Sequence, residues 1–173
     1  MKKGIIFLLS LWLVACSSTY PNQKIMQEFL PNMKGETLEK RSVIIPNDFK
    51  SPQTILLIGY VRNSQFDIDR WLQALKGTNV NTPTYELAAA TGVMSSVFQD
   101  YINNGMRNGI PKEQWKGVVT LYDDAHVLQR FTGNHKPNNA RVMLIDDKGK
   151  VLYFYDRGFS VDALESLKKK ISK

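Results

Sequence analysis

The sequence predicts an α/β domain built on a central mixed β-sheet that is flanked by helices. Residues 54–61 form a continuous apolar run of strand length, which is typical of a strand buried on both faces. Other short strands alternate with segments of helical periodicity, as in parallel βαβ units. Residues 141–155 have the pattern of a β-hairpin, which adds antiparallel pairing and makes the sheet mixed.

The first 15 residues have the features of a bacterial secretory signal. Lys2 and Lys3 precede the apolar residues 4–13, so that a charged segment leads into a short hydrophobic one. This apolar run is too short for a bilayer, which takes about 20 residues to span. We therefore expect residues 1–15 to be a signal peptide.

The sequence Leu13-Val14-Ala15-Cys16 resembles the lipobox of bacterial lipoproteins. The resemblance implies that the Cys16 sulfur receives a diacylglycerol, that cleavage occurs before Cys16, and that the new amino group is acylated. Several acyl chains anchor a protein stably, whereas one chain is marginal. The alternatives are an ordinary signal peptide that happens to contain a cysteine and an uncleaved N-terminal anchor. Ser17 replaces the aspartate that commonly retains lipoproteins in the inner membrane, which implies the outer membrane on its periplasmic side, with the inner membrane as the alternative.

Composition limits what the mature chain can do. Cleavage leaves about 158 of the 173 residues, enough for one domain with its own core. Lys2 and Lys3 leave with the signal, so 21 of the 23 Lys and Arg remain against 16 Asp and Glu, a net charge of about +5. This balance is typical of a solvated face and also fits an anionic membrane or an acidic partner. Cys16 is the single cysteine, so its acylation leaves no thiol for a disulfide.

Ahead of the central strand we expect a tether and one short strand. Residues 16–28 comprise Cys16 and a polar stretch with Pro21, which indicates a flexible tether, so the domain is expected over residues 29–173. Residues 42–45 are a short apolar run closed by a proline, as at the end of a strand.

The central run is followed by the first helix. Apolar residues recur at i, i+3, i+4 and i+7 over residues 68–75, and Gly77 marks the end of this helix. Pro83 introduces residues 84–88 as a strand that a right-handed crossover places parallel to the first.

Two helices and a strand are expected next. Helical spacing over residues 91–102 predicts a helix whose exit is marked by Gly105 and Gly109. Residues 118–122 predict a strand, and Asp123 is a suitable N-cap for the helix that follows. Residues 132–139 have no periodicity and are expected to form a loop.

The last third contains a hairpin and a final helix. Residues 141–145 and 150–155 predict its two strands, with a turn over residues 146–149 in which the glycine permits a positive φ. Ser160 is expected to cap a helix over residues 161–171, on which Val161, Leu164, Leu167 and Ile171 face inward.

This region carries a family resemblance. In thioredoxin-like proteins an Ile-Asp-x-x-Gly-x-Ile phrase precedes a glycine and the last helix, and Val-Met-Leu-Ile-Asp-Asp-Lys-Gly-Lys-Val over residues 142–151, followed by Gly158, is similar. Phe29-Leu-Pro-Asn-Met-Lys-Gly-Glu-Thr-Leu38 is similar to the first hairpin of peroxiredoxin-like and other thioredoxin-fold domains. The resemblance covers about residues 29–171 and implies a thioredoxin-like fold.

A second resemblance concerns a subfamily. Met106-Arg-Asn-Gly-Ile-Pro-Lys-Glu-Gln-Trp115, together with Arg130 and Asn139, is similar to the mitochondrial ATP synthase assembly factors, which have a thioredoxin-like fold. This resemblance implies a role in assembling other proteins.

The departures from the thioredoxin-like pattern bear on function. Redox-active relatives carry a Cys-x-x-Cys pair or one peroxidatic cysteine after the first central strand, where the N-terminus of a helix lowers the thiol pKa. That place here is Arg62-Asn63-Ser64-Gln65, which contains no sulfur, and Ser64 needs a base to act as a nucleophile. The relatives' cis-proline matches Ala140 by position, so the substrate-binding turn departs from the pattern as well.

Other chemistry receives little support from the sequence. His126, His135 and Asp123 are better explained as surface or capping groups than as metal ligands. Asp146 and Asp147 belong to a turn, where aspartate bonds to its own backbone. There is no glycine-rich phosphate loop and no interleaving of basic and aromatic residues for nucleic acid. We therefore expect no catalytic residues, metal or cofactor.

Together these features predict a lipid-anchored thioredoxin-like protein that binds, scaffolds or assembles envelope proteins without redox turnover. The lipid on Cys16 is its contact with the membrane, and Arg62, Asn63, Ser64 and Gln65 are the candidate surface for an envelope protein partner. One alternative is a redox accessory or enzyme of this fold whose reactive group comes from a partner. Another is a purely structural envelope lipoprotein.

Overall fold

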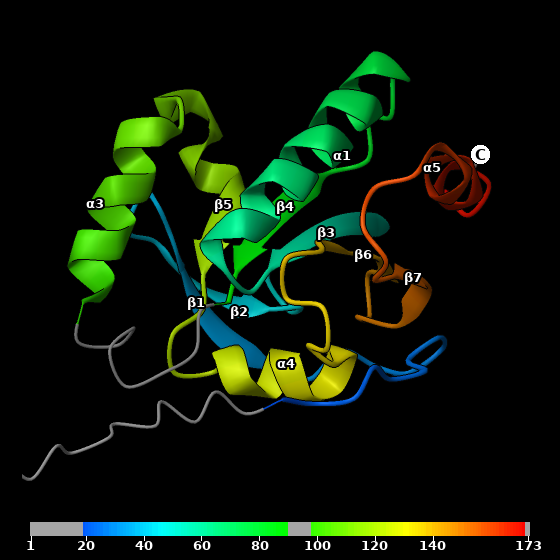
Figure 1. Ribbon diagram of the computed structural model, residues 1–173, viewed down its shortest axis with the longest axis horizontal. Helices are drawn as coiled ribbons and strands as arrows, with labels where there is room; N and C mark the ends of the chain where they lie inside the picture. The colour runs from blue at the N-terminus through cyan, green and yellow to red at the C-terminus, as the bar shows by residue number, and fades with distance from the viewer. Residues whose placement is uncertain (1–18, 90–97, 172–173) are drawn as a thin grey trace, which may run out of the picture.

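The computed structural model describes residues 19–89 and 98–171, which form an α/β fold around one mixed sheet (Figure 1). The seven strands of the described residues have the order β2-β1-β5-β4-β3-β6-β7. In chain order they are β1 (Met33–Thr37), β2 (Ser42–Ile45), β3 (Gln53–Gly59), β4 (Thr84–Ala88), β5 (Val118–Thr120), β6 (Arg141–Asp146) and β7 (Val151–Tyr155). The helices are α1 (Gln65–Gly77), α3 (Gln99–Gly109), α4 (Ala125–Thr132) and α5 (Val161–Lys168), with the 3-10 helices η1 (Arg62–Ser64) and η2 (Lys112–Gly117).

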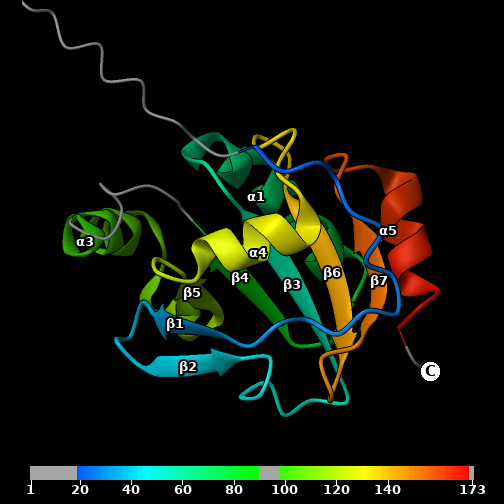
Figure 2. The ribbon, with the colours of Figure 1, turned by 90° about the horizontal axis from the view of Figure 1, so that it is seen from below.

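Strand β3 lies at the centre of the sheet, as the sequence predicted. It pairs in parallel with β4 and antiparallel with β6, so the expected crossover is confirmed. Leu56 and Ile58 belong to a hydrophobic cluster on the face that α4 covers, and Ile55 and Leu57 belong to a second cluster under α1 and α5. All four side chains are fully buried. Figure 2 shows α4 lying across the sheet on the near side.

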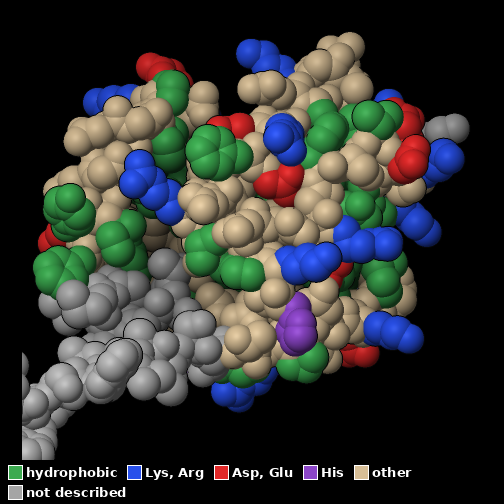
Figure 3. Space-filling view, viewed as in Figure 1, with side chains coloured by type: hydrophobic (Ala, Val, Ile, Leu, Met, Phe, Trp, Pro, Cys, Tyr) green, Lys and Arg blue, Asp and Glu red, His purple; other side chains and the backbone are tan. Residues whose placement is uncertain are grey.

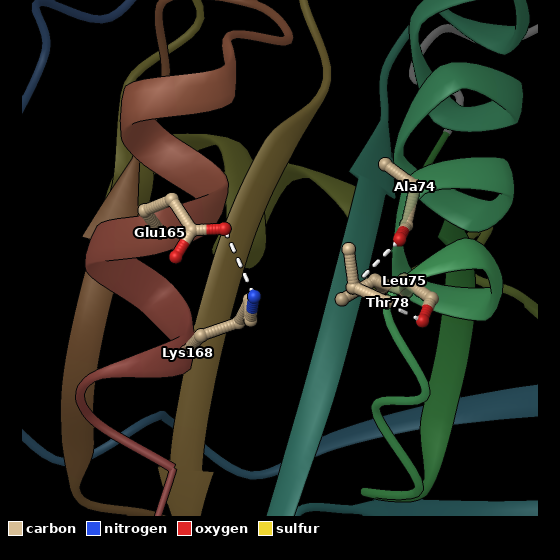
Figure 4. Close-up of polar contacts among 5 residues, drawn as sticks. All are labelled: Ala74, Leu75, Thr78, Glu165 and Lys168. Atoms are coloured by element: carbon tan, nitrogen blue, oxygen red, sulfur yellow. Dashed lines mark hydrogen bonds and ion pairs between the residues drawn. The ribbon is translucent and has the colours of Figure 1, made fainter.

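Helix α1 ends where the sequence predicted. Gly77 is its last residue, and the Thr78 hydroxyl donates to the Ala74 carbonyl at 2.8 Å and to the Leu75 carbonyl at 3.4 Å (Figure 4). The Ala74 carbonyl also accepts the Thr78 N–H at 3.0 Å, and the Leu75 carbonyl accepts the Val80 N–H at 3.1 Å, so the hydroxyl adds a second hydrogen bond to each carbonyl at the end of the helix. In the same view, Lys168 and Glu165 of α5 form an ion pair at 2.9 Å.

The second predicted helix is described from Gln99 to Gly109, and the residues before Phe98 in this prediction lie outside the described residues. Gly105 is inside the helix, and Gly109 is its last residue. The strand predicted over residues 118–122 ends at Thr120, and the central strand ends at Gly59.

The predicted cap at Asp123 is wrong. Helix α4 begins at Ala125, and its N-cap residue is Asp124, whose side chain makes no capping bond. Instead, Asp124 Oδ2 accepts the backbone N–H of Lys34 at 2.7 Å. This carboxylate therefore links the start of α4 to β1, a tertiary contact that competed with local capping.

The hairpin follows the prediction, whereas the last helix departs from it twice: α5 ends at Lys168 instead of residue 171, and Val161 is exposed. Gly149 lies in the turn with φ of +79°, and a Cβ there would be 2.4 Å from Pro46 Cγ, so the turn requires glycine. The Ser160 hydroxyl accepts the Ala163 N–H at 3.1 Å, which confirms the N-cap. Val161, predicted to face inward, is 65% exposed, because it precedes the part of α5 that packs on the sheet.

The described part of the tether expected over residues 16–28 is not flexible; residues 16–18, like the predicted signal peptide over residues 1–15, lie outside the described residues. Asn134 is bonded to both the N–H and the carbonyl of Tyr20, at 2.7 and 3.0 Å. Ile25 is 4% exposed, and the Gln27 N–H donates to the Val151 carbonyl at 2.8 Å. Composition alone suggested a linker, but long-range backbone bonds and one buried side chain hold residues 20–28 on the domain. None of the described helices is long and apolar enough to cross a bilayer.

Replacing Ile58 by alanine should lower the free energy of unfolding by about 2 to 5 kcal/mol, because its fully buried side chain lies between β3 and α4. Chemical denaturation of the mature chain with Cys16→Ser measures this loss. Ile44→Ala is the control: Ile44 is 38% exposed on the edge strand β2 and should lose far less. Equal losses at the two positions would contradict the central place of β3.

Candidate functional site

The candidate partner-binding residues lie at the carboxyl end of β3, where η1 leads into α1 (Figure 1). Arg62 and Asn63 are exposed, and Val61 before them is 41% exposed. Ser64 is 1% exposed, and Gln65 is half-buried. The structure thus brings the four predicted residues into one turn but presents only Arg62 and Asn63 fully to the outside.

Ser64 has a structural role in this turn. Its hydroxyl donates to the Val61 carbonyl at 2.6 Å, within the same turn of 3-10 helix. Gly59 lies directly beneath, because a Cβ at residue 59 would be 2.5 Å from Ser64 Oγ. The hydroxyl proton is therefore committed to a backbone carbonyl, and the oxygen is packed against the end of β3. This geometry does not present Ser64 as a nucleophile.

Asp67, which sequence reasoning missed, joins the start of α1 to two loops at this end of the domain. Its side chain is 8% exposed. Oδ2 accepts the Ala140 N–H at 2.8 Å, and Oδ1 accepts the Phe159 N–H at 2.7 Å. Proline has no N–H, so a proline at residue 140 would remove the first bond. The signal in the sequence is that Asp67 precedes Trp71 by four residues and so lies on the apolar face of α1.

Arg141 shapes the loop before β6 from beneath. It is fully buried, and its guanidinium lies 4.6 Å from the centre of the Tyr60 ring. Nε donates to the Gly133 carbonyl at 3.3 Å, and one terminal nitrogen donates to the carbonyls of Lys136 and Asn139 at 3.0 and 2.7 Å. Burial lowers the pKa of Arg141 from its usual value. The charge also lies at the C-terminus of α4, which favours a cation.

The Tyr60 hydroxyl is bound on the other side of this network. It contacts Thr132 Oγ1 and donates to the Leu128 carbonyl at 3.3 Å. Burial raises the pKa of Tyr60 well above its usual range, so this hydroxyl stays neutral at physiological pH. Tyr60 and Arg141 therefore hold loop 133–140 against α4 without a carboxylate between them.

Glu86 is the other buried carboxyl group near the candidate site. It lies on β4 and is 6% exposed, and Gln65 Nε2 approaches its Oε2 at 3.4 Å. Burial raises the pKa of Glu86 to about 7, while the Gln65 amide lowers it and Asp69 raises it. Its side chain lines a cavity of about 370 Å³ between α1 and η2, together with Leu72 and Lys116. The signal for Glu86 in the sequence is that a charged residue lies in the middle of a predicted parallel strand.

The histidines do not assemble a metal site in the described residues. His126 Nδ1 lies 2.8 Å from the backbone carbonyl of Asp123, and its partner is therefore not the Asp123 carboxylate. His126 borders a shallow cavity of about 330 Å³ with Pro31 and Phe131, whereas His135 is exposed in loop 133–140. Residues 19–89 and 98–171 contain no group of three His, Cys, Asp or Glu placed to hold a metal ion.

This end of the domain exposes groups that can form polar, ionic and apolar contacts with another molecule. Arg62 supplies an exposed charge, Asn63 an exposed amide, and Val61 and Phe66 exposed apolar surface, Phe66 being 72% exposed. Each loop behind them is held by buried hydrogen bonds to Asp67 or Arg141.

Comparisons with solved structures establish the fold. The thioredoxin domain of a thiol-disulfide oxidoreductase from Bacteroides vulgatus aligns with a TM-score of 0.56 at 16% identity, over 87% of this chain and all of that one. A SCO1/SenC family lipoprotein from Bacillus anthracis aligns at 0.57 and 9% identity, over 87% and 97% of the two chains. The exposed lipoprotein thioredoxin of Streptococcus pneumoniae aligns at 0.51 and 13% identity, over 80% and 99%. The fold of this chain is thioredoxin-like, as the sequence resemblance implied.

No protein-family model and no curated protein matches the sequence. At these identities the structural likeness shows the fold alone. The similarity to ATP synthase assembly factors stays a prediction.

The raised pKa of Glu86 makes stability depend on pH. Between the usual glutamate pKa of 4.5 and about 7, the folded state binds more protons than the unfolded state, so stability falls as the pH rises through this range. At about 1.4 kcal/mol per pKa unit, the loss approaches about 3 kcal/mol above pH 7. Glu86→Gln should remove this loss of stability at high pH. The variant should therefore be more stable than the wild type at pH 8 but not at pH 4.

Urea unfolding from pH 4 to 8 measures the difference between the two proteins at each pH. Glu113→Gln is the matched control, because Glu113 lines the same cavity but is exposed. Parallel stability curves for the wild type and Glu86→Gln would contradict a buried, protonated Glu86.

Proposed function

We propose that this chain is a lipid-anchored protein of the outer membrane that faces the periplasm and binds an envelope protein without redox turnover. The observation that carries the proposal is the η1 turn. It exposes Arg62 and Asn63 at the place where redox-active relatives are expected to carry cysteine, and it engages the Ser64 hydroxyl in a bond to a backbone carbonyl. The recognition surface is thus the thioredoxin-like site with its reactive group replaced.

Rigid support favours binding as the use of this surface. The Asp67 carboxylate fixes the loops that end at Ala140 and Phe159, and Arg141 adds further bonds within the first of them, loop 133–140. Loops that are already held in place lose little conformational freedom when a partner binds, which improves affinity. Arg62 adds a charge that forms no ion pair within the described residues and is therefore free for a partner's carboxylate.

The membrane anchor is proposed from the lipobox at residues 13–16. Two structural neighbours are themselves described as lipoproteins, one from Bacillus anthracis and one from Streptococcus pneumoniae. The fold is therefore compatible with attachment through an N-terminal lipid. Ser17 favours the outer membrane in the proposed sorting.

Cys16→Ser should abolish lipid labelling and move the protein from the membrane fraction to the soluble fraction. Metabolic labelling with a palmitate analogue and fractionation of cells measure both effects. Ser17→Asp is a separate variant, which should retain labelling and move the protein toward the inner membrane in a density gradient. Membrane association of Cys16→Ser through an uncut N-terminus would overturn the lipoprotein proposal.

Arg62→Ala with Asn63→Ala should leave the denaturation midpoint nearly unchanged, because both side chains are exposed, and should reduce capture of the envelope partner at least about fivefold. The measurement is photo-crosslinking in cells from a reactive residue placed at position 66. Arg70→Ala with Gln73→Ala, an exposed pair on α1, is the matched control. Equal capture by both variants would place the binding surface elsewhere.

The otherwise wild-type protein with Cys16→Ser contains no thiol. It should therefore neither reduce insulin nor consume peroxide above the buffer background. Turnover by this variant would contradict the non-redox proposal.

A further inference from the structure

The segment 20–28 fixes where the membrane anchor meets the domain. Its first described contacts are the two bonds between Tyr20 and Asn134, and the Arg130 guanidinium lies 5.7 Å from the centre of the Tyr20 ring. A Cβ at Gly133 would be 2.5 Å from the Pro21 carbonyl oxygen, so the segment lies directly against the end of α4. The chain therefore leaves the domain next to loop 133–140.

Covalent geometry then limits the distance to the bilayer. Four residue steps separate Cys16 from Tyr20, and a fully extended chain spans at most about 3.6 Å per residue, or about 14 Å in all. If Cys16 carries the proposed acyl chains, Tyr20, which is bonded to Asn134 of loop 133–140, lies within about 14 Å of the lipidated residue. This step rests on the lipid anchor of the proposed function.

The Arg62 turn is at the same end of the domain as loop 133–140. Strands β3 and β6 are antiparallel with Ile58 opposite Arg141, so the end of β3 lies beside the start of β6. The Asp67 bonds to Ala140 and Phe159 bring the start of α1 and the loop before α5 to the same place. Figure 2 shows the start of the blue segment, the yellow loop before β6 and the start of α1 together at the upper edge.

The chemistry of this end suits an anionic lipid surface. Four cations on it are exposed, namely Arg62, Arg130, Lys136 and Arg157. None of them forms an ion pair among the described residues, where the only such pair is Lys168 with Glu165. Three large apolar side chains are exposed beside them: Val61 at 41%, Phe66 at 72% and Val161 at 65%. Figure 3 views the molecule from this side and shows Lys and Arg side chains across the middle of the face.

Acidic side chains are also present at this end and lower its net positive charge. Asp156 is half-buried beside Arg157, and Asp69 and Asp162 are exposed one turn further along α1 and at the start of α5. Asp67 is buried and bonded to two backbone N–H groups. The exposed balance therefore stays positive, with the cations around loop 133–140, next to the point where the chain leaves for the anchor.

We propose that this end of the domain docks onto anionic lipid headgroups. Arg62, Lys136 and their neighbours contact headgroup phosphates, and Phe66 and Val161 enter the interface between headgroups and acyl chains. Cations near an anionic surface and apolar side chains at its boundary contribute together to such binding. The docked orientation confines the Arg62 turn to the membrane surface, so the proposed protein partner must present its contact surface in the headgroup layer.

The experiment uses the mature chain with Cys16→Ser, which keeps every described residue and carries no lipid. Co-sedimentation with vesicles of phosphatidylcholine alone and with about one third phosphatidylglycerol measures docking without the anchor. We expect binding to the anionic vesicles and release at high salt. Arg62→Glu with Lys136→Glu should weaken the partition at least about tenfold. Lys50→Glu with Lys148→Glu, an equal charge change at the opposite end of the sheet, should weaken it much less.

A second measurement locates the contact. Cys16→Ser leaves no cysteine, so Phe66→Cys adds a single site for an environment-sensitive fluorophore. Its emission should shift to the blue on anionic vesicles, whereas a probe at Phe29→Cys, where the native side chain is 60% exposed near the β6–β7 turn, should not shift.

Equal weakening by the two charge pairs, or no shift from the probe at residue 66, would overturn the proposal and leave this face to a protein partner alone. Because the protein carries no lipid, these outcomes are independent of whether Cys16 is acylated in cells. Failure of the anchor would show instead in the labelling of Cys16.

Discussion

Burial of β3 on both faces fixes the positions of the helices and loops around it. Residues Ile55 to Ile58 alternate between two hydrophobic clusters, one under α4 and one under α1 and α5. A strand buried on both faces cannot slip by one residue without exchanging every side chain between the clusters. Its register therefore determines where the chain emerges, which is at Val61, and it places Tyr60 over Arg141 at the same edge.

Two buried charged side chains hold the loops at the carboxyl end of β3, and both have backbone groups as hydrogen-bond partners. Asp67 accepts two N–H groups, and Arg141 donates to three carbonyls. A backbone group that loses such a partner inside the protein costs about 1 to 3 kcal/mol. The edge is consequently held in one shape although no disulfide or metal ligand is found there. The proposed recognition surface therefore rests on loops whose backbone is held by buried charged side chains.

The position of residues 20–28 connects this edge to the proposed anchor. A flexible tether would let the domain turn freely above the membrane. Here the bonds of Tyr20 to Asn134 and of Gln27 to Val151 remove most of that freedom. With the proposed lipid on Cys16, the same contacts at the end of α4 would place the proposed recognition surface on the side of the molecule that faces the bilayer.

The fold class, the central strand, the crossover to β4, the hairpin turn at Gly149 and the cap at Ser160 could be predicted from the sequence, because hydrophobic periodicity and turn chemistry are local. The place of Arg62, Asn63, Ser64 and Gln65 in one turn could be predicted too. Four features became known from the folded structure: Ser64 points inward, Asp124 bonds to β1, Val161 is exposed, and residues 20–28 lie on the domain. Asp67 and Glu86 owe their roles to partners on other elements, up to 92 residues away for the bond between Phe159 and Asp67, and Arg141 packs against Tyr60, which directly follows β3. Local patterns carry no record of such pairs, because burial and long-range hydrogen bonds exist only once the sheet has brought the loops together.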